Sequence, residues 1–233
     1  MYAKFFKRVI DFTLSLIALI VLSPILLILM IVGAIAMGGN PFFTQMRPGK
    51  IDPKTGKEKI FKLVKFRSMS NKKDKDGNLL PDDGRLNKYG RILRSTSLDE
   101  LPELWNILKG DMAIVGPRPQ LVRDMVFMTT EQRRRHTVLQ GLTGLAQVNG
   151  RNNITWEEKI EYDLQYIDNG ITFAGDIKIV FKTVEKVLKR SDTVREGTVS
   201  DMDFGDWLMM EGKVDQETYE GKQAEAKEVI NTL

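Results

Sequence analysis

The sequence predicts an α+β protein in which an apolar N-terminal helix precedes a compact, mainly helical domain with a few short strands. Three observations lead to this prediction. One continuous apolar segment lies near the N-terminus, one later stretch alternates as strands do, and several further stretches carry apolar residues at helical spacing. The length of 233 residues allows one ordinary domain with an appendage.

The apolar segment runs from Phe12 to Met37, 26 residues without a charge. At about 1.5 Å per residue, a helix of this length exceeds the roughly 30 Å hydrocarbon core of a bilayer. A transmembrane helix is therefore the simplest interpretation. A secretory signal is less favoured, because the apolar part of a signal is usually only about 7–15 residues long.

Ser23-Pro24 in the middle of this segment supports a third interpretation, a re-entrant helix that enters and leaves the membrane on one side. Proline removes a helical hydrogen bond and clashes with the preceding turn, and a serine hydroxyl can bond to a freed carbonyl. Basic residues flank both ends, which fits two cytoplasmic ends and slightly favours the re-entrant form. They are Lys4, Lys7 and Arg8 before the segment, and Arg47 and Lys50 after it.

After the apolar segment, the stretch from Phe61 to Arg67 is predicted to be a strand. Side chains alternate between the two faces of a strand, so Lys65 and Arg67 lie on the same face. A polar loop from Asn71 to Gly84 follows. Apolar residues at helical spacing then predict a helix over Leu98–Leu108. Helices are also predicted over Glu131–Gln140, Trp156–Ile167 and Ile177–Leu188, and a short acidic helix over Tyr219–Ile230.

Charge and composition divide the chain further. The net charge is +4, but residues 201–233 hold nine acidic and three basic residues, a net of −6, which leaves +10 for residues 1–200. A basic body indicates an anionic partner such as phosphate, anionic lipid or nucleic acid. We therefore expect a membrane anchor over residues 1–40, a main domain over 41–194 and an acidic extension over 195–233.

The scarcity of two residue types excludes several kinds of chemistry. The chain has no cysteine, so disulfides, cysteine-zinc sites and thiol nucleophiles are excluded. His136 is the only histidine, which makes a Ser-His-Asp triad or a multi-histidine metal site within one chain improbable. Acid, base or nucleophile roles therefore fall to Asp, Glu, Lys, Arg, Ser or Tyr.

The first candidate for chemistry is the adjacent pair Asp99-Glu100. Ser97 and Glu100 match a capping box, but Pro102 fits the first turn of a helix better if Asp99 is the cap. Both registers place two carboxylates at a helix N-terminus, where the dipole favours ionised Asp. An ionised carboxylate suits a phosphoryl acceptor or a magnesium ligand. Most sequences of this kind are simple helix caps, so the pair alone is weak evidence for chemistry.

Two further segments have residue types that suit a phosphate or nucleotide. Arg118 stands between Pro117 and Pro119, which restrict its backbone, so its planar guanidinium can meet a phosphate at a low entropic cost. A structural arginine in a tight turn is an equally good interpretation of that position alone. The stretch from Gly141 to Asn152 is rich in glycine and amide side chains, but it lacks the spacing of a P-loop or a Rossmann turn.

Taken together, these blocks resemble the bacterial monotopic phosphoglycosyl transferases, also called bacterial sugar transferases. The resemblance runs from about Lys4 to Leu188. It includes Ser23-Pro24, Lys65-Phe66-Arg67-Ser68-Met69, Ser97-Leu98-Asp99-Glu100-Leu101-Pro102-Glu103-Leu104-Trp105-Asn106, Lys109-Gly110-Asp111-Met112, Gly116-Pro117-Arg118-Pro119 and Gly144-Leu145-Ala146-Gln147-Val148-Asn149-Gly150-Arg151.

The resemblance implies transfer of a sugar-1-phosphate from a UDP-sugar to polyprenol (undecaprenyl) phosphate, with release of UMP. In the family, the residue matching Asp99 attacks the donor's proximal phosphate and forms an aspartyl phosphosugar intermediate. Mg²⁺ is implied as the cofactor, held by Asp99 and Glu100. Substrate contacts are expected from Lys65, Arg67, Arg94, Arg118, Gln147, Asn149 and Arg151.

The resemblance also implies a location and partners. A re-entrant helix broken at Ser23-Pro24 would leave both of its ends on the cytoplasmic face of the bacterial inner membrane. The expected partners are the two substrates and membrane lipid, without nucleic acid. The extension over 195–233 lies beyond the family's short core, so we expect it to cover the active site, dock a partner or pair two protomers as a homodimer.

Two other functions compete with this one. Asp74 and Asp76 could form the DxD metal motif of a glycosyltransferase, which would release UDP instead of UMP, although their flexible polar setting indicates a solvated loop. A membrane-tethered basic adaptor would bind anionic lipid or nucleic acid with a steep salt dependence. Such an adaptor has no need for a carboxylate pair beside a proline-flanked arginine, so the transferase is favoured.

Overall fold

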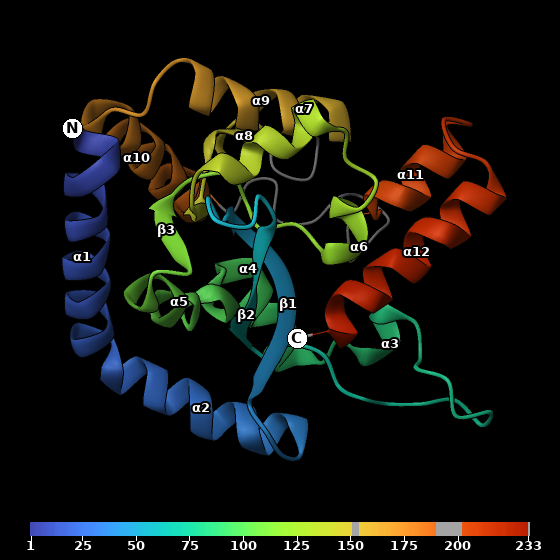
Figure 1. The fold of residues 1–233 in the computed structure, drawn as a ribbon. Helices are drawn as coiled ribbons and strands as arrows, with labels where there is room; N and C mark the ends of the chain where they lie inside the picture. Colours follow the sequence, from blue (N-terminus) through green and yellow to red (C-terminus); the bar gives the residue numbers. More distant parts are fainter. Residues whose placement is uncertain (151–153, 190–201, 233) are drawn as a thin grey trace.

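The computed structural model describes residues 1–150, 154–189 and 202–232 and is a mixture of helices and short strands, as predicted (Figure 1). Two small sheets lie at its centre, and helices surround them. The elements in chain order are η1 (Tyr2–Phe6), α1 (Lys7–Val21), α2 (Ser23–Met37), β1 (Phe42–Ile51), β2 (Glu58–Phe66), α3 (Asp82–Arg85), α4 (Lys88–Thr96), η2 (Leu98–Glu100), α5 (Glu103–Lys109), β3 (Met112–Val115), α6 (Val122–Met125), α7 (Thr130–Arg133), η3 (Arg134–Thr137), β4 (Gln140–Thr143), α8 (Leu145–Val148), α9 (Trp156–Asp168), α10 (Phe173–Lys189), α11 (Phe204–Met210) and α12 (Gln216–Asn231).

The apolar N-terminal segment forms two helices instead of one straight helix. The helical segments Tyr2–Val21 and Ser23–Met37 meet at an angle of 64°. Pro24 lies in the first turn of α2, where its missing N–H costs no hydrogen bond, and the Ser23 hydroxyl donates to the Ile20 carbonyl at 2.7 Å. Within the described residues no single helix reaches the length and apolarity that a membrane crossing needs, whereas the bent pair does so as a unit.

Helix α1 turns three polar residues toward the rest of the protein. Lys7, Asp11 and Ser15 recur every four residues and are all buried. The Lys7 ammonium lies 2.6 Å from Asp176 in α10, and Asp11 accepts a hydrogen bond from the Ile114 N–H in β3 at 3.1 Å. The exposed face of α1 carries large apolar side chains such as Phe12. In Figure 1, α1 runs beside β3 and α5, and α2 leads away from them.

The two sheets and α5 share one apolar core. Strands β1 and β2 are antiparallel, with Phe42 opposite Phe66, whereas β3 and β4 are parallel. Strand β2 confirms the predicted strand over 61–67 with slightly shifted ends; β1, β3 and β4 were not predicted. The core consists of Phe61, Leu63, Leu104, Ile107 and Met112.

Two of the five predicted helices differ from the structure, and three are confirmed. The stretch over 98–108 is divided, because Pro102 cannot donate a backbone hydrogen bond and becomes the N-cap of α5 after the separate turn η2. The stretch over 131–140 is helical only to Thr137, after which Gln140 begins β4. The predicted helices over 156–167, 177–188 and 219–230 correspond to α9, α10 and α12.

The described part of the acidic extension, 202–232, packs on the domain side away from α1 (Figure 1). Ala226 of α12 joins a cluster with Val122, Met125 and Val126 around α6. Buried Asp124 accepts hydrogen bonds from the backbone N–H groups of Phe204 and Leu121 at 2.9 and 3.0 Å. This carboxylate therefore attaches the start of α11 to the segment that follows Arg118.

Candidate active site

The Asp99-Glu100 pair lies in a tight turn between α4 and α5. Helix α4 ends at Ser97, whose φ of 55° makes it the one non-glycine residue with a left-handed backbone in the described ranges. The turn η2 follows at once. Ser97 makes no side-chain capping bond, so the predicted capping box is wrong, and Asp99 does not cap α5 either. The chain instead changes direction at Ser97, after α4, and α5 begins only after Pro102. The residues between them form a short loop.

Lys65 and Arg118 bind the second member of the pair. The Lys65 ammonium lies 3.1 Å from Oε1 of Glu100, and the Arg118 guanidinium donates to the same oxygen. The Glu100 side chain is only 13% exposed, so both contacts occur in a largely desolvated setting. Burial opposes the charge of Arg118, yet the negative charges of Glu100 and Glu103 outweigh it and raise the pKa of Arg118.

Asp99 itself is free for a reaction. Among the residues that the structure describes, its carboxylate makes no hydrogen bond and no ion pair, although Lys65, Arg94 and Arg118 act on it through their charge. Burial, and then the charge of neighbouring Glu100, raise the pKa of Asp99 above that of an exposed aspartate. A poorly solvated carboxylate without a hydrogen-bond donor is a suitable nucleophile once it is ionised.

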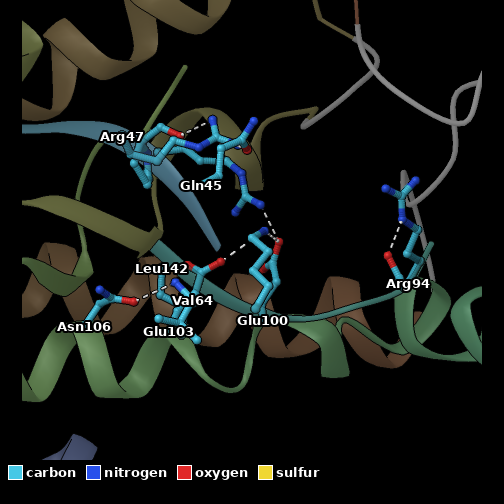
Figure 2. Close-up of polar contacts among 12 residues, drawn as sticks. Gln45, Arg47, Val64, Arg94, Glu100, Glu103, Asn106 and Leu142 are labelled. Atoms are coloured by element: carbon cyan, nitrogen blue, oxygen red, sulfur yellow. Dashed lines mark hydrogen bonds and ion pairs between the residues drawn. The ribbon is translucent and has the colours of Figure 1, made fainter. Parts of the chain in front are cut away.

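Glu103 is a third carboxylate that the sequence analysis did not single out. It is 1% exposed at the start of α5, and its Oε1 lies 3.0 Å from the Lys65 ammonium, whereas its Oε2 has no hydrogen-bond partner in the described part of the chain. Burial raises its pKa. Lys65 thus stands between Glu100 and Glu103, which lie close together in Figure 2.

Asn106 holds α5 against β2, one helical turn after Glu103. Its Oδ1 accepts from the Val64 N–H at 3.1 Å, and its amide donates to the Lys62 carbonyl at 2.8 Å. The buried amide therefore pairs with β2 as a neighbouring strand would. This contact places the Glu103 carboxylate next to Lys65, the residue after Val64.

The loop that carries Arg118 is fixed by two other arginines. Arg47 of β1 donates to the Pro119 carbonyl at 3.0 Å, and fully buried Arg135 donates to the Arg118 carbonyl at 2.6 Å. Burial and the positive charge of Arg118 lower the pKa of Arg47 to about 10. The proline-flanked backbone is thus supported from both sides, which agrees with the low flexibility predicted for it. Arg47 and Arg135 had no sequence motif that distinguished them.

The remaining predicted substrate contacts are arranged less tightly. Arg94 donates to the Ser68 hydroxyl at 3.2 Å and lies to one side of Glu100 in Figure 2. The side chain of Arg67 makes no hydrogen bond or ion pair within the described ranges, so its guanidinium is available to a ligand. The amides of Gln147 and Asn149 donate to the carbonyls of Leu142 and Leu145 and so support the backbone around α8. Arg151 lies outside the described residues.

Two other residue groups have structural roles. His136 is fully buried, and burial lowers its pKa to about 4, so it is neutral at pH 7, where its Nδ1 contacts Glu58 at 3.0 Å. Asp74 accepts from the backbone N–H groups of Asp76 and Asn78 within an exposed turn. These bonds fit the solvated loop expected of the DxD segment and not a metal site.

The carboxylate oxygens of Asp99 and Glu100, hereafter the dyad, suit Mg²⁺. This ion commonly binds one or two carboxylates and fills its other positions with water and substrate phosphates. Within the described residues no group of three or more Asp, Glu, His or Cys side chains forms a metal cage. The carboxylate of Asp99, which has no partner in the described part of the chain and is adjacent to Glu100 in sequence, fits an ion that shares its coordination with a phosphate.

This chain is similar to known proteins over most of its length. Residues 2–190 match the family model of the bacterial sugar transferases. The chain is 47% identical over 182 residues to an uncharacterised sugar transferase, EpsL, of Bacillus subtilis, a match that covers 78% of this chain and 87% of that protein. It is 42% identical over 196 residues to UDP-glucose:undecaprenyl-phosphate glucose-1-phosphate transferase of Klebsiella pneumoniae, covering 78% of this chain and 40% of that protein.

A third relative is undecaprenyl-phosphate galactose phosphotransferase of Salmonella typhimurium, 34% identical over 205 residues, with 81% of this chain and 41% of the relative covered. The chain thus spans about two fifths of the length of the Klebsiella and Salmonella proteins. The chain belongs to the bacterial sugar transferase family and is an enzyme. The resemblance inferred from the motifs is confirmed.

The shared ammonium of Lys65 predicts a stability effect that does not depend on activity. Lys65→Met leaves the buried Glu103 carboxylate without its cation and should destabilise the detergent-solubilised protein by about 3–5 kcal/mol. Adding Glu103→Gln removes the uncompensated charge and should restore much of that loss. Lys59→Met removes a lysine that is 71% exposed from its ion pair with Asp111 and should cost no more than about 1 kcal/mol. Thermal unfolding measures all three, and equal losses for the two lysines would contradict the role given to Lys65.

Proposed function

We propose that this enzyme transfers a sugar-1-phosphate from a UDP-sugar to polyprenol phosphate, namely undecaprenyl phosphate, and releases UMP. The observation that carries the proposal is the carboxylate of Asp99, which makes no hydrogen bond or ion pair in the described ranges and on which the charges of Lys65, Arg94 and Arg118 act. The names of the Klebsiella and Salmonella relatives, which specify glucose-1-phosphate transfer and galactose phosphotransfer to undecaprenyl phosphate, support it. Two relatives named as exopolysaccharide production proteins support a role at the first membrane step of glycoconjugate synthesis.

In the first chemical step, an Oδ atom of ionised Asp99 attacks the phosphorus that carries the sugar. A new O–P bond forms, and the bond between that phosphorus and the bridging oxygen of UMP breaks. UMP leaves as an anion, so the step needs no proton donor, in agreement with the absence of cysteine and the buried, neutral His136. The product on the enzyme is an aspartyl phosphosugar.

In the second step, a phosphate oxygen of the polyprenol phosphate attacks the same phosphorus, and the Asp99 carboxylate leaves. The product is polyprenyl-diphosphate-sugar, and Asp99 returns to its ionised form. Lys65, Arg94 and Arg118 neutralise the negative charge of the phosphates, which is the main requirement of phosphoryl transfer. Arg67, whose guanidinium is unpaired within the described residues, is a further contact for the donor or acceptor.

Mg²⁺ would be held by Asp99 and Glu100 and would supply further charge neutralisation on the diphosphate. Lys65 and Arg118 both contact Oε1 of Glu100 and so hold this carboxylate in place without a metal. Glu100 is therefore positioned before substrates arrive.

We further propose that the bent pair α1–α2 is a re-entrant anchor that leaves the domain on the cytoplasmic face of the bacterial inner membrane. The 64° bend and the burial of the polar face of α1 against the domain support this arrangement. It places the dyad near the headgroups, where the phosphate of the acceptor lies.

The chemistry is tested with Asp99→Asn in the detergent-solubilised enzyme, with Mg²⁺, undecaprenyl phosphate and a panel of UDP-sugars. The variant keeps the size of the side chain but removes the nucleophilic charge, so UMP release should fall by about 10⁴-fold or more. Matched substitutions in the exposed loop, Asp74→Asn and Asp76→Asn, should leave the rate unchanged. Full activity of Asp99→Asn, or UDP as the product of the native enzyme, would refute the proposal.

The topology is tested with single cysteines, which are unambiguous because the chain has none of its own. Lys4→Cys and Lys50→Cys introduce labels at exposed positions on either side of the anchor. In inside-out vesicles both should react with a membrane-impermeant maleimide, and in intact spheroplasts neither should react. Labelling of the two positions from opposite faces would show a spanning helix. Pro24→Ala should shift the population toward that spanning form.

A further inference from the structure

Helix α2, the second half of the bent pair, is attached to α4 by a close contact near Gly33. The Tyr89 hydroxyl donates to the Leu29 carbonyl at 2.9 Å, and Asn87, the N-cap of α4, donates to the Ala36 carbonyl at 3.1 Å. Gly33 is the one buried residue of α2. A Cβ at position 33 would lie only 2.7 Å from the Tyr89 hydroxyl oxygen, so glycine is what permits this approach.

Helix α4 connects α2 to the site, because it also packs closely against Ser68, after β2. A Cβ on Gly90, next to Tyr89, would lie 1.9 Å from the Ser68 carbonyl oxygen. The backbone of α4 therefore packs directly against the chain that follows β2. Arg94, one turn further along, donates to the Ser68 hydroxyl. The helix then ends at Ser97, two residues before Asp99.

Helix α1, the first half of the bent pair, is attached to α5 on the other side of the dyad. The Arg8 guanidinium donates to the carbonyls of Ile107 and Leu108 at 2.6 and 2.8 Å. These are carbonyls of the last turn of α5, where a cation also complements the helix dipole. Gly110, with φ of 91°, allows the chain to turn away directly beneath the guanidinium.

The dyad turn is therefore held between two helices, each attached to a different half of the anchor. We propose that the bent anchor is a structural part of the active site, and that Tyr89, Gly33 and Arg8 are positioning residues for Asp99. The bend between α1 and α2 sets the separation of α4 and α5, and the short turn over 97–102 has little length with which to absorb a change. A shift of either half of the anchor thus moves Asp99 relative to Lys65 and Arg118.

Turnover tests this inference only if the proposed function is correct. The experiment therefore also measures amide hydrogen exchange, which does not depend on that function. Gly33→Ala forces its new Cβ against the Tyr89 hydroxyl. In the detergent-solubilised full chain, amide hydrogen exchange over residues 97–103 should accelerate by about tenfold, equivalent to about 1.4 kcal/mol of local stability. UMP release should fall roughly tenfold to a hundredfold, as a misplaced reacting group predicts.

The decisive variant is the double substitution. Tyr89→Phe alone removes one hydrogen bond and should cost about two- to tenfold in turnover. In Gly33→Ala/Tyr89→Phe the clashing hydroxyl is absent, so exchange and turnover should return to the level of Tyr89→Phe. Val32→Ile adds a methylene to the exposed face of the same helical turn and should match the native enzyme. Membrane fractionation should show every variant still in the membrane.

Arg8→Lys tests the opposite attachment, because lysine keeps the charge but cannot bond to both carbonyls, and it should also accelerate exchange over 97–103. Native exchange in Gly33→Ala and Arg8→Lys, or a double variant as impaired as Gly33→Ala, would overturn the inference. If the native enzyme released no UMP from any donor, the proposed function would fail, while the exchange data would still decide whether the anchor positions the turn.

Discussion

The ammonium of Lys65 is the contact on which the arrangement of the site depends. It joins β2 to the second dyad carboxylate, Glu100, and to buried Glu103, and it does so where little water remains to screen the charges. Two carboxylates so close to a third would repel one another without a cation between them. With Lys65 and Arg118 neutralising Glu100, the turn can hold the poorly solvated Asp99 without a hydrogen-bond or ion-pair partner among the described residues. Within the described residues, Asp99 is the carboxylate of the three that makes no hydrogen bond or ion pair, which is why we propose it as the reactive group.

Much of the fold could be predicted from local patterns. The bend at Ser23-Pro24 follows from what proline removes from a helix, and the predicted helices over 156–167, 177–188 and 219–230 correspond to α9, α10 and α12. The missed strands are short or irregular: β1 contains Pro48 and Gly49, and β3 and β4 have four residues each. Strands of this kind are stabilised by partners distant in sequence, so their own residues carry little signal. The same holds for Gln140, which begins β4 although the stretch over 131–140 was predicted to be helical.

The site was predictable where a motif was compact. Asp99, Glu100, Lys65 and Arg118 were identified from short blocks, and the structure brings the last three into direct contact. The residues that support them were not, because Glu103, Asn106 and Arg47 act through contacts made only in the folded chain. The sequence alone does not show that Glu103 is buried. Tyr89 and Gly33 are a pair 56 positions apart, and no local pattern links a residue of α2 to a tyrosine of α4.

The central claim is that Asp99 becomes covalently attached to the phosphosugar. The most direct test supplies the purified enzyme with Mg²⁺ and its best UDP-sugar donor, but no polyprenol phosphate, and follows both released nucleotide and protein mass. The account predicts a single burst of UMP and a sugar-phosphate adduct on the peptide that contains Asp99, which disappears when undecaprenyl phosphate is added. UMP release that begins only with the acceptor, with an unmodified Asp99 peptide throughout, would contradict it and indicate direct transfer between the two substrates.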